Sequence, residues 1–316
     1  MKKISITIPC YNSENTILKV VQEISDVMKN NKSYGYEIVL VNDGSKDKTY
    51  EVISSIAKSN SHVISIDLAK NFGQSSALLA AYSKATGDYI VTMDDDGEHN
   101  PNDIFILVNK LEEGYDYVCA DFYNYDRSLY KSLGSKFNYW FLSFLMDIPK
   151  GTILSSFNIM RKYVMDEIIK YPNPKPYVDG MVWAITNKVT TVPIEHGHRY
   201  AGESGYNLKN SIALWLNGVT SYSVKPLRIA SFFGFLFAII GFIMMIFVII
   251  RTLIHADVEG WTSLFSIILF IGGFIMIFLG LIGEYVGRGY LINNRIPQYV
   301  IREEVHLNKN GKKKQD

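Results

Sequence analysis

Three consecutive carboxylates, Asp94, Asp95 and Asp96, are the residues of this chain best suited to chemistry. They follow an apolar run at 89–93 that is rich in β-branched residues, and a glycine comes directly after them. This pattern predicts a buried strand that ends in an acidic loop. Alternation along the chain would send Asp94 and Asp96 to the same side, with Glu98 just beyond. Carboxylate oxygens placed in this way suit Mg²⁺ or Mn²⁺ bound to the phosphates of a substrate.

Two other interpretations of the acidic cluster differ in strength. Aspartate and asparagine favour helix caps and first turns, so the cluster fits the start of a helix equally well, and this alternative stays open. An EF-hand fits worse, because Gly97 is the fourth residue from Asp94 rather than the sixth. In addition, Phe105 stands where the twelfth-position glutamate of an EF-hand belongs.

Polar motifs follow three other runs with strand character. They are Pro9-Cys10-Tyr11-Asn12-Ser13-Glu14, Asn42-Asp43-Gly44-Ser45 and Lys70-Asn71-Phe72-Gly73-Gln74. The carboxyl ends of parallel strands lie at one edge of a sheet, so we expect these motifs beside Asp94 and Asp96. Each motif taken alone also fits a turn or a helix cap. The chain has no Walker loop and no GxGxxG motif, so a metal is the simplest means of holding phosphate.

The elements that must position these residues alternate between strand and helix. Predicted strands are Ile4–Pro9, Tyr36–Val41, Val63–Leu68, Asp88–Met93 and Tyr115–Ala120, and predicted helices lie near 14–29, 46–59, 74–86 and 101–112. Helices of this length between strands imply right-handed βαβ crossovers and a mostly parallel sheet. The fold class predicted for residues 1–122 is therefore α/β, of a nucleotide-binding type.

The four motifs, in this order and spacing, resemble the inverting glycosyltransferases of family 2, which have the Rossmann-like GT-A fold. Within that family they resemble the polyprenyl-phosphate glycosyltransferases. This group contains dolichol-phosphate mannose synthase, bactoprenol glucosyltransferase and the aminoarabinose transferase of lipid A modification. The resemblance is carried by Pro9–Asn12, Asp43–Ser45, Asn71–Gly73 and Asp94-x-Asp96, and it continues through 199–206 and 283–288. It covers almost the whole chain.

The resemblance implies a nucleotide-sugar donor, most simply a UDP-sugar, and a polyprenyl phosphate acceptor such as undecaprenyl phosphate. Residues expected at the donor are Pro9, Tyr11, Asn12, Glu14, Asn42, Asp43, Lys70, Asn71 and Asp95. We expect Mg²⁺ or Mn²⁺ on Asp94 and Asp96, with Glu98 as a third ligand or as a neighbour of the ligands.

Three basic residues and one serine are the candidates for holding the acceptor phosphate, because arginine in particular matches phosphate oxygens with a two-pronged fork. The expected set is Arg127, Lys131, Arg199 and Ser204. Together with the metal-binding pair, the predicted catalytic residues are Asp94, Asp96, Arg127, Arg199 and Ser204.

The chain departs from the family pattern near the predicted sugar pocket. Glu98 stands where glutamine is common, and Gly205 replaces a frequent lysine. Residues 152–158 lack the acidic residue and the arginine of several relatives. The sequence therefore does not identify the sugar. Asp179 fits a sugar contact, a catalytic base or a turn carboxylate.

Residues 123–224 are expected to form the acceptor side of the catalytic domain. Apolar residues recur at helical spacing over 129–145 and 208–222, and basic side chains lie within 127–136. Aromatic and basic residues on one amphipathic helix favour a place in the membrane interface. A core-packing role fits the first helix equally well, whereas the second leads directly into a long apolar segment, which favours the interface.

Two apolar segments follow, of 22 residues at 229–250 and 23 residues at 261–283, and neither contains a charged residue. At about 1.5 Å per residue each reaches about 33–35 Å, enough to cross the hydrocarbon core of a membrane. They predict a transmembrane hairpin at 225–288 and a cytoplasmic tail at 289–316. Basic residues flank the outer ends of the pair, whereas the loop at 251–260 has one arginine against two acidic residues. The positive-inside rule therefore places both termini and the catalytic domain on the cytoplasmic side of the plasma (inner) membrane.

Composition agrees with a cytoplasmic catalytic domain. The 32 Lys+Arg and 31 Asp+Glu nearly balance, so net charge does not suggest a nucleic-acid partner. Cys10 and Cys119 lie far apart in predicted strands, which indicates buried thiols in a reducing compartment rather than a disulfide or a zinc site. No signal-peptide pattern begins the chain.

Two alternatives to a polyprenyl-phosphate transferase remain. A processive polysaccharide synthase shares the GT-A domain, but its Gln/Arg-x-x-Arg-Trp motif and its additional membrane spans are not visible. The intact Asp94-x-Asp96 disfavours a non-catalytic accessory subunit. Family analogy adds a flippase and an outward-facing transferase that use the product for a cell-envelope glycan. Relatives include dimers and tetramers, so the state of a homo-oligomer stays open.

Overall fold

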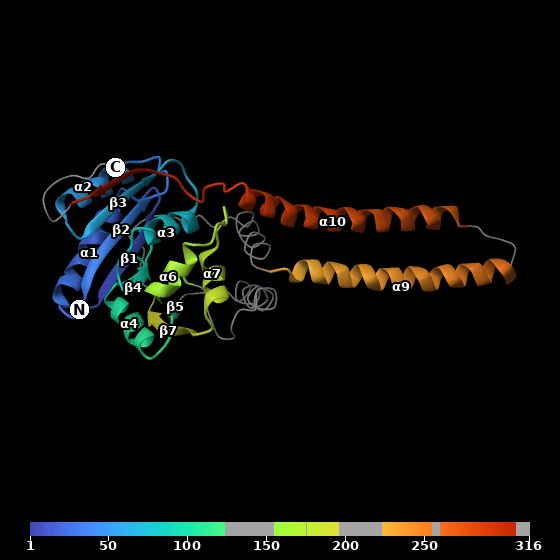
Figure 1. Cartoon of the computed structure of the whole chain (residues 1–316), viewed down its shortest axis with the longest axis horizontal. Coiled ribbons are helices and arrows are strands. Elements are labelled where there is room, and N and C mark those ends of the chain that lie inside the picture. The colour runs from blue at the N-terminus through green and yellow to red at the C-terminus, as the bar shows by residue number, and fades with distance from the viewer. Residues whose placement is uncertain (124–154, 175, 196–222, 255–259, 308–316) are drawn as a thin grey trace.

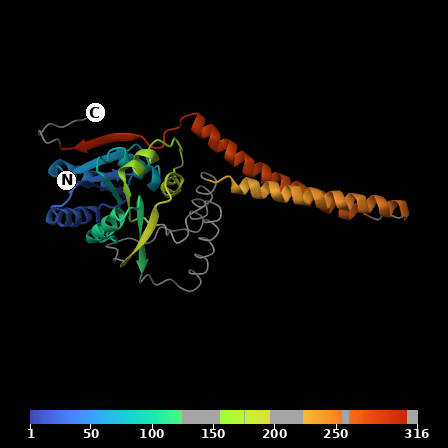
Figure 2. The same ribbon diagram turned by 60° about the horizontal axis from the view of Figure 1, so that its bottom comes forward.

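The computed structural model describes residues 1–123, 155–174, 176–195, 223–254 and 260–307 of the chain. These residues form an α/β domain and two long helices that project from one side of it (Figures 1 and 2). The chain leaves the domain at the first long helix and returns to it after the second. The two long helices are therefore joined to the domain at both ends of the helix pair.

One sheet of eight strands runs through the described part of the domain. In chain order the strands are β1 (Lys3–Cys10), β2 (Gly35–Asn42), β3 (Val63–Leu68), β4 (Tyr89–Thr92), β5 (Tyr117–Tyr123), β6 (Asn158–Arg161), β7 (Val189–Glu195) and β8 (Ile301–His306). Their spatial order is β7-β5-β6-β4-β1-β2-β3-β8. The central strands β4, β1, β2 and β3 are parallel, as the sequence predicts, and Ile6 pairs with both Ile38 and Val91.

Helices cover both faces of the sheet. They are α1 (Ile17–Asn30), α2 (Thr49–Ser59), α3 (Gln74–Tyr82), the 3-10 turn η1 (Pro101–Asp103), α4 (Ile104–Glu112), α6 (Lys162–Ile168) and α7 (Val178–Ile185). In α1 the buried apolar side chains recur every three or four residues from Ile17 to Met28, so the helix has one face to bury. Helices α1, α2 and α4 pack on one face of the sheet, whereas α3 packs on the other. Helices α6 and α7 join α3 in a third cluster of buried side chains.

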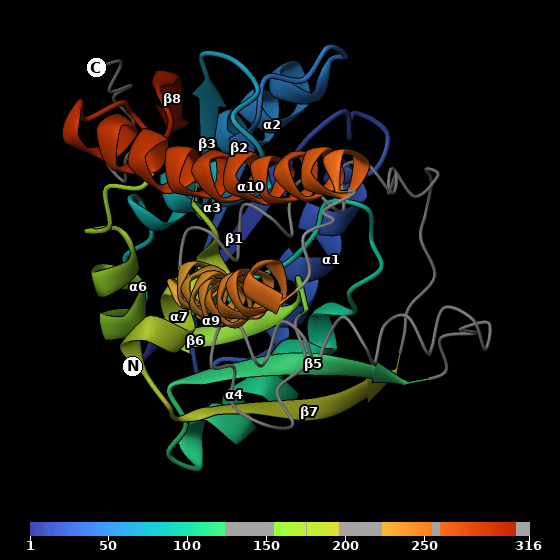
Figure 3. The same ribbon diagram turned by 90° about the vertical axis from the view of Figure 1, so that its right-hand side faces the viewer.

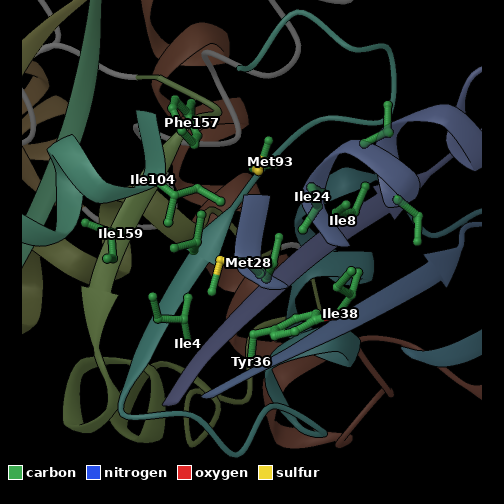
Figure 4. Packing of buried hydrophobic residues seen from close by; sticks show 14 of the residues in the cluster. Ile4, Ile8, Ile24, Met28, Tyr36, Ile38, Met93, Ile104, Phe157 and Ile159 are labelled. Carbon is green, nitrogen blue, oxygen red and sulfur yellow. The ribbon is translucent and has the colours of Figure 1, made fainter. Parts of the chain in front are cut away.

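The packing between α1 and the sheet fixes the strands that lead to the site. Figure 4 shows Ile24 and Met28 of α1 beside Ile4, Ile8 and Ile38 of β1 and β2. All five side chains are almost fully buried. Burial of one such side chain stabilises the fold by roughly 1.5–3 kcal/mol. This packing therefore fixes the positions of β1 and β2 and of the loops that follow them.

The outer half of the sheet differs from the predicted parallel order. Strand β6 lies antiparallel between β4 and β5, so that Ile159 pairs with both Val91 and Val118. Strand β5 is thereby separated from the parallel core, although it pairs in parallel with β7 on its other side. The sequence does not reveal β6, because this strand is only four residues long. A run that short carries no clear alternation in the sequence.

The last strand comes from the segment that the sequence places in a tail. Strand β8 pairs antiparallel with β3, with Ser65 opposite Val305 and Asp67 opposite Glu303. Figure 3 shows β8 beside β3 at the edge of the sheet. Residues 301–306 therefore belong to the sheet of the catalytic domain.

The two long helices are α9 (Lys225–Ile254) and α10 (Trp261–Asn293). Both are long enough and apolar enough to cross a membrane, and their most apolar parts are not buried by the rest of the described structure. They contact each other through aromatic side chains, with the ring centres of Phe237 and Phe274 5.2 Å apart. The predicted apolar segments 229–250 and 261–283 lie within these two helices.

A buried carboxylate organises the edge of the sheet at which β1, β2 and β4 begin. Glu37 accepts hydrogen bonds from the Lys3 ammonium at 2.5 Å and from the Thr86 amide at 2.6 Å. The Ser5 hydroxyl also donates to Glu37, and it accepts from the Gly87 amide at 2.8 Å. These contacts fix the amino ends of the strands, whereas the candidate site lies at their carboxyl ends.

Candidate active site

An open cleft of about 280 Å³ lies at the carboxyl edge of the parallel strands. The residues that line it are Pro9, Cys10, Tyr11, Asp43, Asn71, Gly73, Gln74, Asp94 and Asp95. They come from the end of β1, from the loops after β1, β2, β3 and β4, and from the first residue of α3. The four motifs that are far apart in the sequence therefore meet in one place, as the parallel arrangement predicts.

Asp43 ties the loop after β2 to the loop after β3. Its side chain is buried and accepts hydrogen bonds from the Phe72 amide at 2.7 Å and the Gly73 amide at 2.9 Å. Burial raises the pKa of the Asp43 carboxyl, although the two amide donors act in the opposite direction. The carboxylate is therefore occupied in shaping the cleft wall.

Gly44 is where these two loops approach most closely. Its backbone has a φ of +63°, and a Cβ on it would lie 2.4 Å from the Asn71 amide nitrogen and 2.5 Å from the Lys70 carbonyl carbon. Both contacts would be with backbone atoms, which cannot move aside as a flexible side chain can. The predicted Asp43-Gly44-Ser45 motif thus requires glycine for both its conformation and its space.

The polar residues after β1 turn toward the loop after β2 and contact it. The Asn12 side-chain oxygen accepts from the Lys46 amide at 2.9 Å, and the Asn12 amide donates to the Ser45 hydroxyl at 3.0 Å. The Glu14 carboxylate accepts from the Lys48 amide at 2.9 Å. Asn12 and Glu14 therefore brace the loops and are not among the residues that line the cleft.

Asp94 lies just beyond the end of strand β4, and both its side chain and its backbone amide form hydrogen bonds. Its carboxylate accepts from the Gln74 side-chain amide at 3.1 Å and from the Ser156 hydroxyl. Its backbone amide donates to Nδ1 of His99 at 3.1 Å, which leaves Nε2 of the neutral ring as the protonated nitrogen. That Nε2 lies 3.8 Å from the Asp94 carboxylate.

The two neighbouring aspartates behave differently from Asp94. Asp95 accepts from the Tyr11 amide at 3.0 Å, and burial, together with Asp94 and Asp96, raises the pKa of its carboxyl to about 6. Asp96 accepts from the Glu98 amide at 3.0 Å within a turn in which Gly97 has a φ of +82°. Strand β4 ends at Thr92. The alternation assumed for a strand therefore does not extend through the acidic triplet.

Residues 5–169 match the family described as glycosyl transferase family 2, and residues 225–288 match the GtrB C-terminal hairpin. The chain belongs to glycosyl transferase family 2. The resemblance seen in the sequence is confirmed, since the first match contains all four loops of the cleft. The second contains the whole of α9, and α10 as far as residue 288.

Curated relatives in family 2 are similar to the chain along nearly their whole length. A prophage bactoprenol glucosyl transferase homolog of Escherichia coli (strain K12) is 34% identical over 95% of this chain and 98% of its own. An undecaprenyl-phosphate 4-deoxy-4-formamido-L-arabinose transferase of Klebsiella pneumoniae (strain 342) is 29% identical over 100% of this chain and 98% of its own.

A solved structure supports the GT-A fold of the catalytic domain. Glucosyl-3-phosphoglycerate synthase from Mycobacterium tuberculosis, in complex with Mn²⁺, UDP-glucose and phosphoglyceric acid, is similar with a TM-score of 0.51 and 18% identity. The similarity covers 70% of this chain and 78% of that one. At this identity the similarity shows a shared fold and no more.

A metal fits the cleft through its donor chemistry, with one difference from the expected ligand set. Asp94 places a hard carboxylate against the cleft, and Asp96 follows two residues later. Within the part of the chain that the structure describes, no three His, Cys, Asp or Glu side chains converge as a metal site. This finding does not favour Glu98 as a direct third ligand, and its role as a neighbour of the ligands stays a prediction. A cation here would take further ligands from phosphate oxygens and water.

The expected acceptor residues cannot be placed. Arg127, Lys131, Arg199 and Ser204 lie outside the described residues, as do the amphipathic segments 129–145 and 208–222.

The remaining expected residues near the donor are described. Asn71 and Pro9 line the cleft. Lys70 is exposed beside it, with its ammonium 5.0 Å from the centre of the Phe72 ring. Asn42 is buried at the end of β2, and its side-chain amide donates to Asp67 at 2.7 Å.

Three residues that contact Asp94 are missing from the predicted site: Gln74, His99 and Ser156. Gln74 stands in a predicted motif, but its role depends on the tertiary approach of α3. His99 is almost fully buried, and its ring stacks on Phe157 with ring centres 4.9 Å apart. A single histidine or serine has no periodic signal, so sequence patterns alone do not reveal these contacts.

The sequence is compatible with Asp179 as a sugar contact, a catalytic base or a turn carboxylate. It lies in the first turn of α7 and accepts from the Tyr117 hydroxyl at 3.1 Å. Burial raises the pKa of its carboxyl to about 6. Asp179 is not among the residues that line the cleft.

Proposed function

We propose that the protein transfers a sugar from a UDP-sugar to undecaprenyl phosphate and so makes a lipid-linked sugar. The observation that carries this proposal is the combination of two parts in one chain. The first part is the carboxyl-edge cleft with Asp43 and Asp94 in a family 2 domain. The second part is the hairpin match, together with relatives named for bactoprenol and undecaprenyl-phosphate transfer.

The donor nucleotide would lie in the cleft between the loops after β1, β2 and β3. Tyr11, which is aromatic, and Asn71, which is polar, both line this cleft and would contact the nucleotide. Asp43, which braces the cleft wall, would border the base and ribose. Lys70 is exposed beside the cleft and would offset phosphate charge.

The sugar diphosphate would face Asp94 and Asp96. In this proposal these two carboxylates would hold Mg²⁺ or Mn²⁺, with Glu98 as a neighbour of the ligands. When bound, the metal would neutralise charge that develops on the departing nucleotide, as a Lewis acid does. Gln74 and Ser156 hold the Asp94 carboxylate from the protein side, so its orientation does not depend on the metal.

The acceptor needs little activation, because a phosphate oxygen is an anion near neutral pH. That oxygen would attack the anomeric carbon while the bond from this carbon to the nucleotide diphosphate breaks, and UDP would leave with the electron pair. The main tasks of the protein are then to position the two anions and to offset their charge. Arg127, Lys131, Arg199 and Ser204 are the proposed residues for the acceptor phosphate. Direct displacement inverts the anomeric centre, so an α-linked donor gives a β-linked product.

The proposed setting is the plasma (inner) membrane, with α9 and α10 as two membrane spans. The catalytic domain and both termini would lie on the cytoplasmic side, where nucleotide-sugars are made. The product would then need a flippase and an outward-facing transferase before its sugar reaches an envelope glycan. A homo-oligomer is compatible with this arrangement.

The test uses purified full-length protein in detergent with undecaprenyl phosphate, a panel of radiolabelled UDP-sugars, and Mg²⁺, Mn²⁺ or EDTA. Label should enter the organic phase from one donor and should be lost with EDTA. Asp94→Asn should reduce the rate roughly 100-fold. Asp88→Asn is the matched control, because Asp88 is an exposed carboxylate at the opposite end of the same strand and accepts from the Lys3 amide.

Three results would count against the proposal. If no donor labels the lipid phase while the folded protein binds UDP, the acceptor or the activity is different. If EDTA has no effect, the metal assignment is wrong. Full activity in Asp94→Asn would contradict the role given to that carboxylate.

A further inference from the structure

The strand that follows the membrane hairpin is tied to the catalytic domain beside the cleft. Strand β8 adds to the edge of the sheet next to β3, and the Ala69 amide donates to the Val300 carbonyl at 2.9 Å just before the strand begins. Ala69 stands directly before the Lys70-Asn71 motif, so β8 is anchored at the start of a loop that lines the cleft.

Arg302 makes the decisive contacts of this strand. One guanidinium nitrogen lies 3.3 Å from the Asp67 carboxylate, and the other donates to the Ala69 carbonyl at 2.6 Å. The Asp67 side chain is 5% exposed, whereas the Arg302 side chain is 61% exposed. An exposed residue thus supplies the counter-charge for a carboxylate that is buried at the end of β3.

From Asp67 the contacts continue into the cleft loops. The other Asp67 oxygen accepts from the Asn42 side-chain amide at 2.7 Å. The Asn42 oxygen accepts in turn from the Ser45 amide at 3.2 Å. The Ser45 hydroxyl then accepts from the Asn12 amide at 3.0 Å. This chain of contacts joins the loops after β1, β2 and β3, which carry most of the cleft lining.

We propose that Arg302 is a positioning residue for the donor nucleotide. Through Asp67 and Asn42 it holds the loops after β1 and β2, and through the Ala69 carbonyl it holds the loop after β3. This inference rests on the proposed function, because it assumes that the cleft binds the nucleotide. It adds that the segment after the membrane hairpin supports the loops of the donor site.

A second ion pair of β8 separates the docking of the strand from the contacts that Arg302 makes near the cleft loops. Glu304 lies 2.5 Å from the Lys84 ammonium, and both side chains are about one-third exposed. Lys84 follows α3 at the end away from the cleft, so this pair holds β8 on the domain without touching a cleft loop. Loss of the Glu304 contact weakens strand docking alone, whereas loss of the Arg302 contacts also leaves a buried carboxylate without its cation.

The experiment measures the equilibrium affinity of the full-length protein for UDP in the presence of Mg²⁺, by calorimetry in detergent. Arg302→Ala should weaken UDP binding roughly fivefold to tenfold, and Glu304→Ala should leave it within about twofold of the wild type. Arg302→Lys should recover part of the affinity, because one ammonium reaches either Asp67 or Ala69 but lacks the fork that engages both. In the transfer assay, Arg302→Ala should raise the KM for the donor and leave kcat at saturating donor within about twofold.

A double-mutant cycle tests the route through Asp67. Asp67→Asn keeps the acceptor for Asn42 but removes the charge that Arg302 faces. If Arg302 acts through Asp67, the two substitutions together should weaken UDP binding less than the product of their separate effects.

Specific outcomes would overturn the inference. They are an unchanged UDP affinity in Arg302→Ala, an equal loss in Glu304→Ala, and independent effects in the double-mutant cycle. A lower thermal midpoint with unchanged UDP affinity would likewise assign Arg302 to stability alone. Failure of the proposed function looks different, because then the wild-type protein itself binds no UDP.

Discussion

Some residues of the cleft wall tolerate little change of side chain, and Gly44 is the clearest case. A side chain there would meet the backbone of Lys70 and Asn71, and the residue also has a φ of +63°. We expect Gly44→Ala to push the loops after β2 and β3 apart. It should weaken UDP binding at least tenfold and also lower the thermal midpoint.

Gly114→Ala is the matched control for Gly44→Ala. Gly114 also has a positive φ, of +111°, but a Cβ there would meet no atom within 4 Å. Both substitutions cost about 1–2 kcal/mol for the left-handed backbone conformation, and only Gly44→Ala adds a clash at the cleft. The measurement is UDP affinity and thermal midpoint for both variants. Equal losses of UDP affinity would show that the close approach at Gly44 does not shape the cleft.

The residue scale also shows what a sequence can predict about a site. Asp43 and Asp94 are predictable because each follows an apolar run and belongs to a motif with a known spacing. His99 and Ser156 contact Asp94 but come from segments without periodicity. Their positions depend on how β6 and the loop before η1 approach the end of β4, which is tertiary information.

At the scale of elements, the parallel core could be predicted and the added strands could not. Strands β1 to β4 are buried by helices on both faces, and so they appear as apolar runs with helices between them. Strand β8 is an edge strand with the sequence Ile301-Arg302-Glu303-Glu304-Val305-His306, which shows no apolar run. Its partner β3 lies more than 200 residues earlier in the chain. Pairing of this kind is decided by the rest of the fold and leaves no local pattern.

The Glu37 contacts at the amino edge of the sheet should support stability and leave the cleft unaffected. Burial alone would raise the pKa of the Glu37 carboxyl, but hydrogen bonds from Lys3, Ser5 and Thr86 together lower it. A group whose pKa is lowered in the folded state stabilises the fold above its unfolded pKa, near 4.5. That contribution is lost as the pH falls through the lower, folded pKa.

Glu37→Gln should therefore reduce the free energy of unfolding by about 1–3 kcal/mol at pH 7, because the Lys3 ammonium then faces a neutral amide. The difference from the wild type should shrink as the pH falls below about 4.5. Thermal midpoints in detergent across this pH range measure the effect. Glu113→Gln is the control, since Glu113 forms an exposed pair with Lys110 and should change stability by less than about 1 kcal/mol. A difference that is constant with pH would contradict this account of Glu37.

At the scale of the whole molecule, the chain leaves the α/β domain for the hairpin of α9 and α10 and then returns to it. After α10 it returns to the domain, where the Gln298 side chain donates to the Tyr171 and Asn173 carbonyls, and then adds β8 to the sheet. The two helices are therefore held at both ends, since α9 leaves the domain and α10 leads back into it. If α9 and α10 cross a membrane, this double connection places the outer ends of both helices on the same side as the domain. The basic residues predict that this side is the cytoplasmic one.

This orientation can be tested with introduced cysteines, because the natural thiols are out of reach. Cys10 and Cys119 are both 0% exposed, so they should give little background with a membrane-impermeant maleimide. Asp257 lies in the sequence between the two helices, and Lys29 is exposed on the catalytic domain. In spheroplasts the Asp257→Cys variant should be labelled directly, whereas the Lys29→Cys variant should be labelled only after the membrane is permeabilised. The reverse pattern would place the catalytic domain outside, away from cytoplasmic nucleotide-sugars. Labelling of both variants without permeabilisation would show that the helices do not form a spanning hairpin.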